Sequence, residues 1–112
     1  MPEEDHETWL LEEGHRVIER KVAEGYFSLP PRERLIYCLW VADYGMRNAG
    51  DLAPAEDLYP SVLPDGLSVA RELDLPRCIE AFSLPPSELE ERYFSLFDAI
   101  ASELRAIGTN AA

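Results

Sequence analysis

The segment from Pro31 to Arg47 is apolar on almost every side, and this feature constrains the fold more than any other in the chain. A surface helix carries apolar residues on one face, whereas a helix that is apolar all round must be covered by its neighbours. The segment therefore predicts a central helix enclosed by other helices. Its large apolar residues are Leu35, Ile36, Tyr37, Leu39, Trp40, Val41, Tyr44 and Met46.

The flanking segments repeat apolar residues at spacings of three and four, which is the period of a helix. They predict a first helix from about Glu7 to Gly25, with Trp9 folded back onto the core, and a long final helix that closes at Gly108. No β-like alternation of useful length occurs. We expect an all-α fold in which residues 1–112 form one domain of five or six helices, with 1–6 and 109–112 frayed or disordered. The predicted apolar face of the first helix is Leu10, Leu11, Gly14, Val17, Ile18 and Val22.

The pentapeptide Phe-Ser-Leu-Pro-Pro occurs twice, at 27–31 and at 82–86. Proline lacks a backbone donor and keeps the preceding residue out of the helical region, so each copy predicts the end of one helix and the start of the next. The Phe and Leu of each copy can pack on the core, but whether Trp9, Tyr26, Phe27 and Phe94 belong to the core or to an interface stays open. After the second copy, Ser87 and Glu90 match the S-x-x-E capping box. The residues beyond the prolines differ, so we interpret the repeat as a helix boundary and not as a duplicated binding motif.

The region between the two main helices is divided by prolines and predicts short elements. From Asp51 to Pro64 we expect a loop with one helical turn around Ala55–Leu58. A short helix is expected after Pro64, and another from Pro76.

The chain carries 22 acidic and 10 basic residues, which gives a net charge of −12. Such a surface repels phosphate backbones and anionic lipids, so direct binding to nucleic acid or a membrane is not expected. It suits a basic protein partner, although the same charge also serves solubility. Whether the chain forms a homodimer stays open. The candidate partner-binding acids are Glu12, Glu13, Glu19, Asp51, Glu56, Asp57, Asp65, Glu88 and Glu91.

The two cysteines and the acidic N-terminal residues favour a cytoplasmic location. Cys38 and Cys78 stand singly in apolar stretches, as expected of buried thiols in a reducing compartment. The acidic N-terminal residues are the reverse of a signal peptide. The longest apolar run, Leu35–Ala42, is far shorter than the ~20 residues that cross a bilayer.

Few residues point to chemistry. His6 and His15 each complete an E-x-x-H pattern, but both lie near the chain start, and di-iron sites draw such motifs from separate helices. We therefore expect no metal and no cofactor, and we assign no catalytic residue. One interior pocket is a candidate, formed by Asp43, Trp40 and Tyr44 with His15 as a further contributor. The alternative role for Asp43 is an ion pair with Arg47, four residues later.

One further pattern runs from about Leu29 to Ile107. A helix with the sequence LPPRERLIYCLWVADYG is followed by Asn48-Ala49-Gly50-Asp51, then by short helices and a long final helix. This order resembles a bacterial family of unknown function that includes a DNA-mimic protein. The family places Asn-Gly-Gly-aromatic after the first helix, and here Ala49 and Asp51 depart from it. The resemblance implies an α-helical domain without known catalysis, whose carboxylates stand in for DNA phosphates on the basic face of a transcription factor.

Three functions remain as hypotheses. The first is a small acidic, non-enzymatic interaction protein of the cytoplasm that binds a basic protein partner, with DNA mimicry as its specific form. The second is an immunity protein that neutralises a basic toxin. The third is a small-molecule-binding or catalytic helical bundle that uses Asp43.

Overall fold

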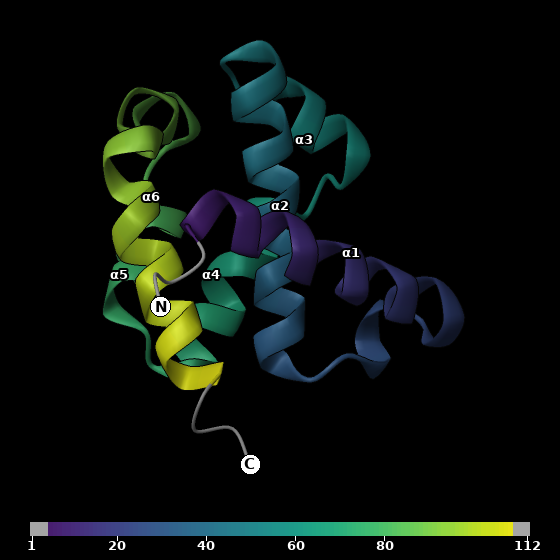
Figure 1. Ribbon diagram of the computed structural model, residues 1–112. Helices are drawn as coiled ribbons and strands as arrows, with labels where there is room; N and C mark the ends of the chain where they lie inside the picture. The colour runs from purple at the N-terminus through teal and green to yellow at the C-terminus, as the bar shows by residue number, and fades with distance from the viewer. Residues whose placement is uncertain (1–4, 109–112) are drawn as a thin grey trace.

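The computed structural model describes residues 5–108, and this part of the chain folds into six α-helices and one 3₁₀ turn (Figure 1). It contains no strand, which confirms the all-α prediction. Of the predicted frayed ends 1–6 and 109–112, residues 1–4 and 109–112 lie outside the described residues, whereas His6 begins α1 and Asp5 caps it by accepting the N–H of Thr8. The elements are α1 (His6–Glu24), η1 (Tyr26–Ser28), α2 (Pro31–Ala49), α3 (Ala53–Leu58), α4 (Val62–Leu73), α5 (Pro76–Phe82) and α6 (Pro86–Gly108).

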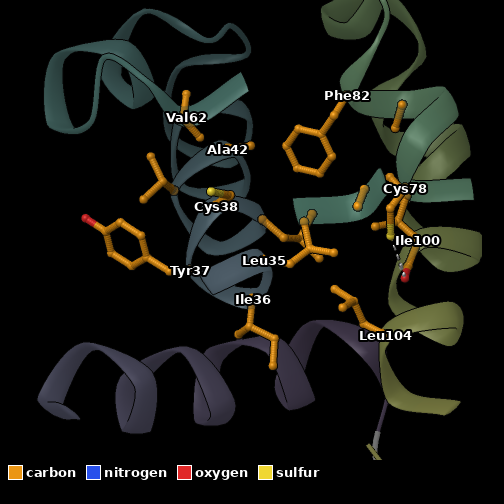
Figure 2. Packing of buried hydrophobic residues seen from close by; sticks show 14 of the residues in the cluster. Leu35, Ile36, Tyr37, Cys38, Ala42, Val62, Cys78, Phe82, Ile100 and Leu104 are labelled. Atoms are coloured by element: carbon orange, nitrogen blue, oxygen red, sulfur yellow. Dashed lines mark hydrogen bonds between the residues drawn. The ribbon is translucent and has the colours of Figure 1, made fainter. Parts of the chain in front are cut away.

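Helix α2 is the centre of the fold, as its composition predicts. It contacts α1, α3, α4 and α6, and its side chains radiate toward these neighbours (Figure 2). Ile36 points toward α1, whereas Leu35 points toward the side occupied by α5 and α6. Both are fully buried. The helix ends where predicted, because Gly50 adopts the left-handed conformation and donates its N–H to the Met46 carbonyl.

Helix α1 crosses α2 at a glycine. Gly14 lies against the Trp40 ring so closely that a Cβ there would be 2.2 Å from Trp40 Cδ1. Trp9 is buried, as predicted, with the Arg105 guanidinium of α6 5.5 Å from its ring centroid. The last turns of α1 extend beyond this crossing (Figure 1). The prediction that Val22 packs on the core is therefore wrong, since Val22 is 80% exposed.

The two Phe-Ser-Leu-Pro-Pro copies both mark helix boundaries, as predicted. Pro31 begins α2 and Pro86 begins α6. Phe82 packs on the core, whereas Phe27, for which the sequence left core and interface open, is 84% exposed. Phe27 lies in the 3₁₀ turn η1. Leu29, which directly follows this turn, is buried.

The predicted capping box at the start of α6 does not form. Ser87 lies inside the helix, which already begins at Pro86. The Glu90 carboxylate instead accepts the backbone N–H of Leu52, 2.8 Å away in the loop before α3. A carboxylate cap does occur in α5, where Glu103 of α6 accepts the N–H groups of Arg77 and Cys78, both at 2.9 Å. Tertiary contacts thus supply partners for backbone N–H groups that helix starts and loops leave unpaired.

The positions that the prolines predict for the short helices are correct for two of them and wrong for one. Helix α5 begins at Pro76, and α3 includes the predicted turn at Ala55–Leu58. Helix α4 begins at Val62, before Pro64 and not after it as predicted. Proline is tolerated in a first turn because the N–H groups there have no intrahelical acceptor. Among the described residues, no helix has both the length and the apolar content to cross a membrane.

We expect Gly66→Ala to destabilise the protein by roughly 1–3 kcal/mol. A Cβ at this position in α4 would lie 2.5 Å from the buried Phe82 ring, so the ring or the helices would have to move. Glycine-to-alanine exchange in a helix normally stabilises by up to about 1 kcal/mol, so the sign of the change is diagnostic. Urea denaturation measures it. Ser68→Ala, at an exposed site of the same helix, is the control and should change stability by less than about 0.5 kcal/mol.

Cys38 and Cys78 are both fully buried and not disulfide-bonded, and burial raises the pKa of the Cys38 thiol to about 12. Burial also raises the pKa of the Cys78 thiol, with the Glu103 carboxylate nearby acting in the same direction. Because the thiolate is the reactive form, we expect no reaction with a thiol reagent at about pH 8 in the native protein. Two thiols per chain should react in urea. Rapid reaction of either thiol in the native protein would contradict the packing around α2.

Candidate functional site

Asp43 is the one buried acidic residue among the described residues, with 4% of its surface exposed. It lies on α2 and accepts hydrogen bonds from two side chains. The Tyr93 hydroxyl of α6 donates to Oδ1 at 2.5 Å. Arg47 Nε, one turn along α2, lies 2.9 Å from Oδ1 and 3.0 Å from Oδ2. The predicted ion pair with Arg47 is therefore present, and Tyr93 adds a link between α2 and α6.

Arg47 connects this carboxylate to two other helices. One guanidinium nitrogen lies 3.6 Å from Glu7 of α1. The guanidinium carbon lies 5.2 Å from the ring centroid of Phe94 and 5.0 Å from that of Phe97, both in α6. Cation–π contacts of this kind and the two carboxylates hold the guanidinium at the meeting point of α1, α2 and α6.

Opposing effects act on the pKa of Asp43. Burial raises the pKa, because a low-polarity surrounding disfavours the charged form. The Tyr93 hydroxyl and the Arg47 guanidinium both lower it, and burial is the larger effect. The same contact raises the pKa of Tyr93 well above its ordinary value, since the buried hydroxyl would have to ionise beside a carboxylate. Tyr93 is accordingly a hydrogen-bond donor and remains protonated.

The three predicted pocket residues, Asp43, Trp40 and Tyr44, lie together at a half-open surface hollow of about 160 Å³ between α1 and α2. The Trp40 and Tyr44 rings stack with their centroids 6.0 Å apart and an interplanar angle of 10°. His15, the suggested fourth contributor, is exposed on α1 and is not among the lining residues. The hollow is lined by Leu11, Trp40, Asp43, Tyr44, Arg47 and Asn48.

The hydrogen bonds of Asp43 limit what this hollow can do chemically. Arg47 and Tyr93 already occupy both carboxylate oxygens. A general base must be within reach of its substrate, and this carboxylate is buried and paired with Arg47, so the arrangement suits a structural carboxylate better than a catalytic one. The aromatic wall of Trp40 and Tyr44 is the accessible part, since Tyr44 is 42% exposed.

Five of the nine candidate partner-binding acids belong to neighbouring segments at one end of the molecule, which we call the acidic end. Asp51 precedes α3, Glu56 and Asp57 lie in α3, and Glu88 and Glu91 lie in the first turns of α6. The hydrogen bond from Leu52 to Glu90 holds the loop before α3 against the start of α6. Figure 1 shows α3 and the start of α6 at the same end. Except for the half-buried Asp51, all of these carboxylates are exposed, and none lies in an ion pair within residues 5–108.

The other four candidate acids lie elsewhere. Glu12 and Glu19 are exposed on α1. Glu13 is half-buried and pairs with Arg16 at 2.5 Å and with Arg32 at 4.0 Å. Asp65 is half-buried and accepts a hydrogen bond from the hydroxyl group of Tyr59. Glu13 and Asp65 are thus engaged within the fold, whereas Glu12 and Glu19 belong to the solvent face of α1.

A second hollow, of about 280 Å³, lies between α1 and the start of α2. Its charged residues pair with one another: Arg16 with Glu13, and Arg20 with Glu33 at 2.7 Å. This internal pairing leaves little net charge to attract a ligand, in contrast to the acidic end. The lining residues are Glu13, Arg16, Val17, Glu19, Arg20, Arg32 and Glu33.

In the second E-x-x-H pattern, Glu12 and His15 are both exposed on α1. Glu3 of the first pattern lies outside the described residues. Its partner His6 accepts a hydrogen bond from Arg105 at Nδ1, at 3.0 Å, and its Nε2 lies 3.1 Å from the Ser102 hydroxyl. Within residues 5–108, no group of three His, Cys, Asp or Glu side chains is placed to hold a metal ion.

Comparison with known proteins gives no match: no family model, no curated protein and no solved structure is similar to this chain. The resemblance to a DNA-mimic family therefore stays a prediction. Sequence reasoning did not identify Tyr93 and Glu7 as partners of the Asp43–Arg47 pair. A tyrosine on the buried face of a helix needs a hydrogen-bond partner, which was the available signal for Tyr93.

We expect the stability difference between the wild-type protein and Asp43→Asn to depend on pH. Because burial raises the pKa of Asp43, the folded protein keeps this proton at pH values where the unfolded chain has lost it. The resulting stabilisation is fully present below about pH 4 and is lost as the pH rises through the folded pKa. The wild-type protein should therefore lose stability relative to Asp43→Asn as the pH rises toward neutrality.

Urea denaturation at stepped pH values measures this difference. The neutral amide of asparagine does not titrate, so subtracting its curve removes the contribution of the other carboxylates. A difference with the opposite slope would mean that Arg47 and Tyr93 outweigh burial.

Proposed function

We propose that this protein is a non-enzymatic interaction protein of the cytoplasm that binds a basic segment of a protein partner through its acidic end. The observation that carries the proposal is the grouping of Asp51, Glu56, Asp57, Glu88 and Glu91 from three segments of the chain, without ion-pair partners in the described residues. Elsewhere on the surface, several acids pair with arginines, among them Glu13, Glu33, Glu72 and Glu80. Other exposed acids without an ion pair in the described residues, such as Glu19 and Asp98, lie on α1 and along α6.

Electrostatics supports a basic partner over other ligands. A net charge of −12 repels nucleic acid and anionic membranes, and it accelerates encounter with a positively charged surface. The burial of Asp43 and its pairing with Arg47 support a binding role over catalysis. The specific form of the proposal is DNA mimicry, in which the carboxylates occupy the basic surface that a partner uses for DNA.

We expect a partner captured from a lysate of the source organism to be lost when the acidic end is neutralised. The test variant combines Glu56→Gln, Asp57→Asn, Glu88→Gln and Glu91→Gln, which changes the net charge from −12 to −8. Proteins retained at low and at high salt are identified by mass spectrometry. Binding of the wild-type protein should weaken as salt screens the charges, and the variant should bind at least about tenfold more weakly, equivalent to ~1.4 kcal/mol.

The matched control neutralises four exposed acids away from the acidic end, by Glu19→Gln, Glu24→Gln, Asp74→Asn and Asp98→Asn. It has the same net charge of −8 as the test variant, so only the location of the lost charges differs. Equal retention of the partner by the two variants, or binding that is insensitive to salt, would refute a role for the acidic end. Displacement of the captured partner by duplex DNA would separate DNA mimicry from other forms of basic-protein binding.

A further inference from the structure

The hollow beside Trp40 and Tyr44 lies at the margin of the acidic end. Tyr44 and Asn48 occupy the last turns of α2, and Asp51 follows two residues after this helix ends at Ala49. On the other side, Glu91 is three residues before Phe94, whose ring contacts the Arg47 guanidinium that lines the hollow. A partner segment seated on the acidic end would therefore reach the hollow as well.

The charges inside the hollow are already compensated. Asp43 pairs with Arg47 at 2.9 Å, and Glu7 lies 3.6 Å from the same guanidinium. A further charged group entering the hollow would find no unpaired partner there. What the hollow offers is apolar surface, since Leu11 is 46% exposed and Tyr44 is 42% exposed. Exposed aromatic and aliphatic side chains around a depression are typical of sites that anchor a partner side chain.

The size of the hollow selects the occupant. A cavity of roughly 150 Å³ lined by apolar side chains can hold benzene, and this hollow measures about 160 Å³. One phenyl-sized side chain therefore fits within it. The wall is also fixed in advance: Trp40 lies against Gly14 on one side and stacks on Tyr44. Such preorganisation lowers the entropic cost of binding.

We propose that the hollow takes one large apolar side chain of the partner, of phenylalanine size, from within a basic segment whose flanking cationic side chains lie on the acidic end. This inference rests on the proposed function and adds a specificity element to it. The carboxylates attract basic segments in general, whereas the hollow selects those with an apolar side chain at the matching position.

Two peptides test this inference. The first has four lysines around a central phenylalanine, and the second has alanine in the central position. NMR titration of the isotope-labelled protein at low salt gives the affinity of each peptide and the residues whose signals shift. We expect the phenylalanine peptide to bind at least about fivefold more tightly, because its ring leaves water, and to shift the Trp40 indole signal.

Variants of the protein show whether the preference for the phenylalanine peptide comes from the hollow. Tyr44→Ala and Leu11→Ala remove exposed parts of the hollow and should abolish the preference for phenylalanine while leaving the binding of the alanine peptide unchanged. Phe27→Ala is the control, because Phe27 is an even more exposed aromatic residue, lies in the turn after α1 away from the hollow, and should leave the preference intact. Circular dichroism checks that each variant stays helical.

The outcomes distinguish this inference from the proposed function. Equal binding of both peptides, or a phenylalanine preference that survives in Tyr44→Ala, would overturn the anchoring role of the hollow and leave the acidic end as the binding surface. Binding of neither peptide at low salt would overturn both. A phenylalanine preference that is lost in Tyr44→Ala and kept in Phe27→Ala supports the inference.

Discussion

The structure depends on one buried carboxylate. Asp43 lies on a helix that is enclosed by its neighbours, and a buried charge without partners is strongly unfavourable. Tyr93 and Arg47 supply those partners, and in doing so they fix the position of α6 relative to α2. Loss of either partner would leave the buried carboxylate with one hydrogen-bonding side chain in place of two. The Asp43 contacts thus tie α6 to α2 at this position.

The same contacts shape the surface. Arg47 is held by Asp43 and Glu7 and by two rings of α6, so its guanidinium forms a fixed part of the hollow and not a mobile surface charge. Trp40 is fixed by the close approach of Gly14. A rigid apolar depression therefore lies beside a group of carboxylates that have no ion-pair partners in the described residues. Electrostatic attraction and shape selection, the two components of the proposed recognition, come from adjacent parts of one scaffold.

Local signals in the sequence predicted the helices well where a single residue decides the outcome. Pro31, Pro76 and Pro86 each begin a helix, and Gly50 ends one, because these residues restrict or extend backbone freedom wherever they stand. The Asp43–Arg47 pair was also predictable, since residues four apart share a helix face. Predictions of a specific hydrogen-bond partner were less successful, although the burial of Trp9 was predicted correctly. Glu90 was expected to cap its own helix, but the unpaired N–H of Leu52 lies within its reach in the folded chain.

By itself, the sequence determined an all-α domain around one enclosed helix, its negative charge and most helix boundaries, because periodicity, composition and proline geometry act over a few residues. Only the tertiary structure decided which apolar residues the core would reach: Val22 and Phe27 stay exposed because α1 extends past its crossing with α2. It also decided which acids share a surface and which are engaged within the fold. Those outcomes depend on how helices cross, and a crossing is set by contacts between residues far apart in the chain, such as Asp43 with Tyr93 and Gly14 with Trp40.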